Sequence, residues 1–66
     1  MESLGEALPR EQKRCREVLE QYLAIGPAGN FGAIMIQQSL TRAEKAVMGG
    51  DLAEMIAAYN DLKEIK

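Results

Sequence analysis

The sequence predicts an all-α fold, a three-helix bundle with helices over residues 9–25, 28–48 and 51–65 joined by short loops. Apolar residues recur at steps of three and four along most of the chain, which is the spacing of one helix face. Glycine-containing breaks separate the periodic segments, at Gly26-Pro27 and at Gly49-Gly50. No segment alternates between apolar and polar residues as a half-buried strand does.

The first helix is expected to begin near Pro9, because proline fits the first turn of a helix, where its missing N–H breaks no hydrogen bond. Its apolar stripe consists of Leu8, Cys15, Val18, Leu19, Tyr22 and Leu23. Gly26 can adopt positive φ after the last turn, and Pro27 cannot simply continue the helix. Residues 1–7 contain Gly5 and two glutamates, and we expect them to form a flexible arm before a single helical domain at 8–66.

The second helix has two possible starts, with Pro27 as its first residue or Asn30 as its N-cap, and the pattern slightly favours Pro27. At 100° per residue, apolar residues cover two opposite faces of its first half. One face carries Gly29, Ala33, Ile36, Leu40, Ala43 and Val47, and the other carries Phe31, Ile34 and Met35 before it turns polar. A helix that is apolar all round at one end is expected to be buried there on all sides.

The third helix begins with a capping box, in which Asp51 is the N-cap and Glu54 follows three residues later. Its seam residues Leu52, Met55, Tyr59 and Leu62 follow the 3-4-3 spacing of helical bundles. The connection before it is short, so the second and third helices are predicted to be antiparallel neighbours.

The chain is short for a stable core, and this favours association. With 66 residues it forms one domain, and domains of this size often need disulfides, metals or a partner subunit. Cys15 is the only cysteine and the chain has no histidine, so an internal disulfide and a zinc site with histidine ligands are both excluded. We therefore expect a homo-oligomer, most simply a dimer, or a complex with another protein.

The residue types argue against catalysis and cofactor binding. Without histidine, neither a Ser-His-Asp nor a Cys-His arrangement can form, so we expect no catalytic residues, no cofactor and no metal. Gly26, Gly29 and Gly32 precede a helix as in phosphate-binding loops, but no strand comes before them and no Gly-Lys-Ser/Thr follows. We expect these glycines to end one helix and to allow close packing of the next.

Charge and hydropathy bear on the setting of the protein. The net charge of −2 argues mildly against nucleic acid as a partner. No apolar run is long enough to span a membrane, and the acidic start does not have the pattern of a signal peptide. We expect a cytoplasmic protein that needs no membrane and no small-molecule substrate.

Two functional hypotheses follow from these observations. The first is a small interaction module whose surface includes Phe31, Ile34, Met35 and Gln38, next to the helix junction formed by Gly26, Pro27, Gly29, Asn30 and Gly32. The apolar face could equally be internal, sandwiched between the other two helices, or an exposed interface. The pattern leaves both possibilities open.

The alternative is a small DNA-binding regulator that uses the second and third helices as a helix-turn-helix-like pair. The spacing of Ala46, Gly50, Ile56 and Tyr59 roughly matches the buried positions of that motif. However, the would-be recognition helix carries Asp51, Glu54, Asp61 and Glu64 against only Lys63 and Lys66, and such a helix is repelled by DNA.

Three sequence blocks resemble a group of short, uncharacterised proteins of bacteriophages and prophages. They are L-P-R-E at Leu8, I-G-P-A-G-N-F-G-A at Ile25, and G-D-L-A-E-M-I-A-A-Y ending at Tyr59, and together they cover nearly the whole chain. The resemblance implies a phage or mobile-element setting. It implies no particular activity.

Overall fold

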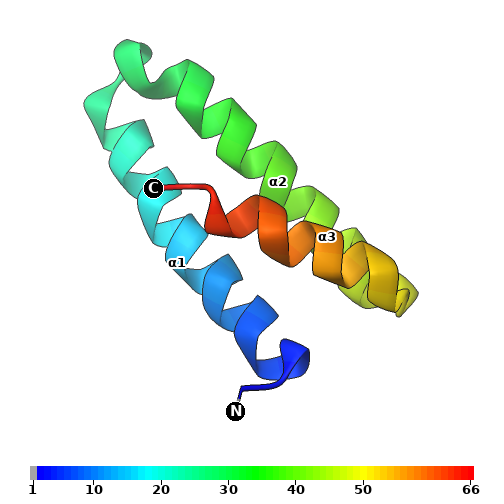
Figure 1. Cartoon of the computed structure of the whole chain (residues 1–66). Coiled ribbons are helices and arrows are strands. Elements are labelled where there is room, and N and C mark those ends of the chain that lie inside the picture. The colour runs from blue at the N-terminus through cyan, green and yellow to red at the C-terminus, as the bar shows by residue number, and fades with distance from the viewer. Residues whose placement is uncertain (1) are drawn as a thin grey trace.

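A computed structural model describes residues 2–66 and confirms the all-α, three-helix fold. The helices are α1 (Leu4–Ile25), α2 (Asn30–Gly49) and α3 (Leu52–Lys63), and a single 3-10 turn, η1 (Pro27–Gly29), precedes α2. Each of the three helices packs against the other two, and no strand occurs within residues 2–66 (Figure 1). None of these helices is long and apolar enough to cross a membrane.

The start of α1 differs from the expectation. The helix begins at Leu4, so the predicted flexible arm is wrong for residues 4–7; Met1 lies outside the described residues. Ser3 has extended backbone angles, and its carbonyl accepts hydrogen bonds from the N–H groups of Glu6 and Ala7 at 3.1 and 2.8 Å. The helix therefore passes through Pro9 instead of beginning there.

Burial explains why α1 tolerates a proline in its second turn. Pro9 cannot donate a hydrogen bond to the carbonyl of Gly5, four residues earlier, which ordinarily disrupts a helix interior. Gly5 is exposed, however, so water can reach that carbonyl. Because α1 begins before Pro9, it also includes Ala7 and Leu8, which are both buried. Leu8 is completely inaccessible to solvent. The apolar contacts offset the missing bond.

The junction between α1 and α2 combines the two predicted starts of the second helix. Gly26 has φ 89°, as expected for the residue that ends α1, and its N–H donates to the carbonyl of Leu23 at 3.1 Å. Helical structure then begins at Pro27, but its first turn is 3-10, and the α-helix proper begins at Asn30. Asn30 is not an N-cap, because Gly29 occupies that position.

The connection between α2 and α3 follows the prediction closely. Gly50 ends α2 in the left-handed conformation with φ 69°, and its N–H donates to the carbonyls of Ala46 and Val47. The Oδ1 atom of Asp51 accepts hydrogen bonds from the N–H groups of Ala53 and Glu54, at 2.9 and 3.3 Å, which confirms Asp51 as the N-cap of α3. The helix ends at Lys63, two residues before the predicted end.

The core lies where all three helices meet, and we call this part of the molecule the three-helix end. Its buried residues are Leu8, Cys15, Ile36, Leu40, Ala43, Ala46, Ala58 and Leu62. Arg14 attaches the C-terminal end of α3 to α1 by donating to the carbonyls of Leu62 and Ile65, at 2.9 and 2.7 Å. Leu62 is in the last turn of α3 and Ile65 lies just beyond it, where backbone carbonyls lack the full set of helical partners. Arg14 is held in turn by Glu11.

The helices differ in length, and the difference leaves one end of the molecule less covered. α3 has 12 residues, against 22 in α1 and 20 in α2. At about 1.5 Å per residue, α3 is roughly 15 Å shorter than α1. Figure 1 shows α3 running from the end of α2 to the middle of α1, while the cyan and green segments continue beyond it. We call this outer part, residues 23–35, the two-helix tip.

Candidate interaction surface

The two-helix tip exposes several large apolar side chains. Phe31 is 77% exposed, Ile34 55% and Met35 51%, and Gln38 is also exposed on the next turn of α2. In the single chain these predicted interaction residues therefore lie on the surface and are not sandwiched between helices. Leu23 and Ile25, at the end of α1, are exposed as well. Leu23, Ile25, Phe31, Ile34 and Met35 together form what we call the tip patch.

The two faces of α2 explain this exposure. Ala33, Ile36 and Leu40 are buried and belong to the face that packs inward. Phe31, Ile34 and Met35 belong to the opposite face. The expectation that α2 is buried on all sides at its beginning is therefore wrong, because this face points away from the other helices, and its continuation at Gln38, Arg42 and Lys45 is exposed as well.

The junction glycines allow α1 and α2 to approach closely, as predicted. A Cβ atom on Gly29 would overlap the backbone carbonyl of Tyr22, and one on Gly32 would overlap the Tyr22 ring. Tyr22 thus lies directly against the backbone at the start of α2. The N–H groups of Gly26 and Gly29 donate to carbonyls within the junction, so neither is available as a donor for a bound phosphate.

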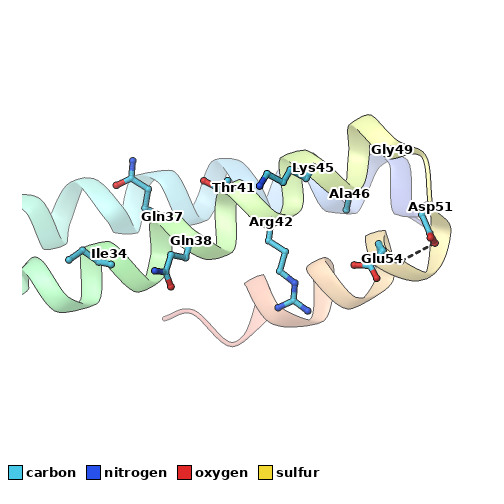
Figure 2. Close-up of a pocket in the computed structure, with 10 residues that line it drawn as sticks. All are labelled: Ile34, Gln37, Gln38, Thr41, Arg42, Lys45, Ala46, Gly49, Asp51 and Glu54. Atoms are coloured by element: carbon cyan, nitrogen blue, oxygen red, sulfur yellow. Dashed lines mark hydrogen bonds between the residues drawn. The ribbon is translucent and has the colours of Figure 1, made fainter.

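A hollow of about 640 Å³ extends along the exposed face of α2 toward the start of α3 (Figure 2). Its lining residues are Ile34, Gln37, Gln38, Thr41, Arg42, Lys45, Ala46, Gly49, Asp51 and Glu54. Ile34 lies at the end nearer the tip, whereas Gly49 and Asp51 lie at the far end. The hollow is open to solvent, and most of its lining residues belong to α2.

The charges on this surface are placed away from the tip. The Arg42 guanidinium points toward α3, where it lies 4.0 Å from the Asp61 carboxylate, and Lys45 follows one turn later. Asp51 and Glu54 add two carboxylates at the far end of the hollow. Residues 21–41, in contrast, contain no Asp, Glu, Lys or Arg.

The exposed face of α2 extends beyond the predicted interaction residues. The prediction names Phe31, Ile34, Met35 and Gln38 as the interaction surface. The periodicity also places Arg42 and Lys45 on the polar continuation of that face, with Thr41 beside them, but the prediction assigns them no role. Two signals in the sequence point to them. Steps of three and four connect Gln38 with Thr41, Arg42 and Lys45, and the long uncharged segment before Arg42 marks an unusual stretch for exposed helix.

Cys15 lies far from this surface and is fully buried. Burial raises the pKa of its thiol, and the nearby Arg14 opposes the increase only in part. A buried, protonated thiol is a poor nucleophile and a poor metal ligand. Within residues 2–66, no three His, Cys, Asp or Glu side chains gather into a possible metal site.

No protein-family model, curated protein or solved structure significantly matches this chain. The main features of the candidate surface are an exposed apolar tip, an uncharged segment around that tip, and a hollow on the same helix face.

Proposed function

We propose that this protein is a small, non-enzymatic protein–protein interaction module that associates with itself through the exposed face of α2. The observation that carries the proposal is the exposure of Phe31, Ile34 and Met35 side by side on one helix face. Clustered apolar side chains of this size on a small domain are typical of interaction sites. The resemblance of three sequence blocks to phage proteins supports a phage or mobile-element setting.

The total surface area supports association. The chain exposes 4590 Å², whereas about 4,200 Å² is typical of a folded monomer of its mass. Covering each of the three apolar side chains contributes roughly 1.5–3 kcal/mol when burial is complete. A second copy can therefore provide apolar contacts that this short chain cannot provide for itself.

The absence of charge around the tip favours a second copy as the partner. Two identical surfaces always bring like charges together unless the contact region is neutral or the charges are offset. Residues 21–41 carry no charged side chain, so this segment can face a second copy without like-charge repulsion. An interface evolved for a different protein usually includes charged residues that select that partner.

Sedimentation equilibrium tests the proposal with Phe31→Asp and a matched control. We expect the wild type to be dimeric at about 100 μM, and Phe31→Asp to weaken association at least tenfold, because it places a charge in the apolar patch. Phe31 is largely exposed, so the variant should keep its helical circular dichroism. Asn60→Asp adds the same charge at an exposed position of α3 and should leave the dimer intact.

A wild type that sediments as a monomer at this concentration overturns the self-association. The same preparation also tests the DNA-binding alternative by titration with a labelled duplex at about 50 mM salt, where electrostatic binding is strong. We expect no binding, because the exposed carboxylates of Asp51 and Glu54 stand at the start of α3. Salt-sensitive binding would favour the regulator instead.

A further inference from the structure

We infer that two copies pair antiparallel along α2, so that Phe31 of each copy fills the far end of the hollow on the other. This inference rests on the proposed self-association and specifies its geometry. The occupant of the hollow is thus a second copy of this chain. Three observations support the arrangement: the shared helix face, the position of the hollow, and the placement of the charges.

The protruding residue and the hollow lie on the same face of α2. At 100° per residue, Phe31, Gln38, Arg42, Lys45 and Gly49 fall within about 60° of one another. All five are exposed. Phe31 is at the start of this face, and the small Gly49, which lines the far end of the hollow, is at its end (Figure 2). The face thus carries a large aromatic side chain at one end and free space at the other.

An antiparallel pair brings these two ends together. If Phe31 of one copy lies opposite Met48 and Gly49 of the other, the two-fold axis passes between residues 39 and 40. Gln38 then lies opposite Thr41, so uncharged polar groups meet near the axis. Met48 is the most exposed of the large apolar residues, and its thioether can contact the ring of Phe31.

The same register separates the positive charges. Arg42 lies opposite Gln37, and Lys45 lies opposite Ile34, whose apolar side chain can pack against the lysine stem. In a parallel pair, Arg42 would face Arg42 and Lys45 would face Lys45 of the second copy, and like charges in direct opposition are destabilising. A parallel pair would also place one Phe31 on the other and leave both hollows unfilled.

The antiparallel pair is closed, because each copy contributes one Phe31 and one hollow and both are used. Paired helices of 20 residues are in contact over about 30 Å. An interface of standard size buries roughly 800 Å² on each partner. The tip patch and the hollow together offer apolar surface at both ends of that length.

Single-cysteine cross-linking tests the geometry. Cys15 is first replaced by Ala, and Asn30→Cys and Gly49→Cys are then made separately at exposed positions. In the antiparallel pair, residue 30 of one copy lies opposite residue 49 of the other, whereas the two copies of residue 30 are about 28 Å apart along the helices. An equimolar mixture treated with a short bis-maleimide, with linker length of about 8 Å, should give cross-linked dimers, and Asn30→Cys alone should give at least tenfold fewer.

Gln38→Cys provides a second readout, because both copies of residue 38 lie near the axis and should cross-link to each other. Strong cross-linking of Asn30→Cys alone would overturn the antiparallel pair while leaving self-association in place. A sedimenting dimer in which none of the three positions cross-links would overturn it too, by placing the contact on another face. A wild type that is monomeric by sedimentation overturns both the geometry and the proposed function.

Discussion

The three-helix end and the two-helix tip are built from the same two long helices, yet they bury their apolar residues to different extents. At the three-helix end, Leu8, Cys15 and Leu62 are completely inaccessible to solvent. At the tip, Phe31 and Ile34 are mostly exposed although they are as apolar as the core residues. α3 covers the α1–α2 pair at the three-helix end and does not reach the tip. Phe31 and Ile34 also lie on the face of α2 that remains exposed along the helix. Apolar sequence alone therefore does not distinguish core from exposed surface in this molecule.

The comparison also separates two ways of holding helices together. The three-helix end depends on large side chains that fill the space between helices and on Arg14, which joins α3 to α1. The tip depends on close approach to α2 at two glycines, where the backbone carbonyl of Tyr22 lies against Gly29 and the Tyr22 ring lies against Gly32. We expect the three-helix end, which contains the core, to contribute most of the stability. The two-helix tip leaves the face of α2 that carries Phe31, Ile34 and Met35 exposed. Three substitutions test this division.

The largest effect is expected for Leu62→Ala at the three-helix end. Because Leu62 is fully buried, the change should lower the free energy of unfolding by about 2–5 kcal/mol through lost burial and a residual cavity. Leu23→Ala is the matched control at the tip, where the side chain is 55% exposed, and should lower it by less than about 1 kcal/mol. Urea denaturation at low protein concentration measures both. Equal losses would show that the two ends are not different in packing.

An intermediate effect is expected for Gly29→Ala within the tip. The new Cβ would overlap the Tyr22 carbonyl and push α1 and α2 apart, which should destabilise the protein by about 1–3 kcal/mol. Gly49→Ala makes the same chemical change in α2 where no atom lies within 4 Å of the new Cβ. It should instead stabilise by up to about 1 kcal/mol. Thermal melts of both variants give the comparison, and a neutral Gly29→Ala would show that the close approach is unimportant.

The smallest effect is expected for Arg14→Met. The variant keeps an apolar stem but removes the donors to the carbonyls of Leu62 and Ile65. Because Arg14 is partly exposed and water can replace some of these bonds, we expect a loss of about 1 kcal/mol. Faster hydrogen exchange should be confined to the last turn of α3. A uniform increase along all three helices would mean that Arg14 supports the whole core.

Local rules account for the features that the sequence predicts well. Gly26, Gly50 and Asp51 mark the ends of helices because each has a conformational or capping property that acts within a few residues. The start of α1 differs from its prediction because it depends on contacts between residues that are far apart in the sequence. A rule for Pro9 considers only the local hydrogen bond, whereas the burial of Leu8 by distant residues decides the outcome.

The candidate surface was predictable only in part. The periodicity shows that Phe31, Ile34 and Met35 share a face, but it does not show whether another helix covers that face. Coverage depends on the length of α3 and on where it crosses α2, and both are properties of the assembled structure. The uncharged segment at residues 21–41 is the sequence feature that best indicates the exposed tip.

The C-terminal end of the chain returns to the middle of α1, where Arg14 holds the carbonyl of Ile65, while the described N-terminal residues lie at the end of α1 opposite the tip (Figure 1). The N-terminal end is thus separated from the tip by the length of α1. A fluorescent label or an affinity tag attached there would lie at the end of the molecule opposite the tip. Two differently tagged versions of the protein can be mixed in one cell, and energy transfer between them can report their pairing without an obstruction at the contact itself.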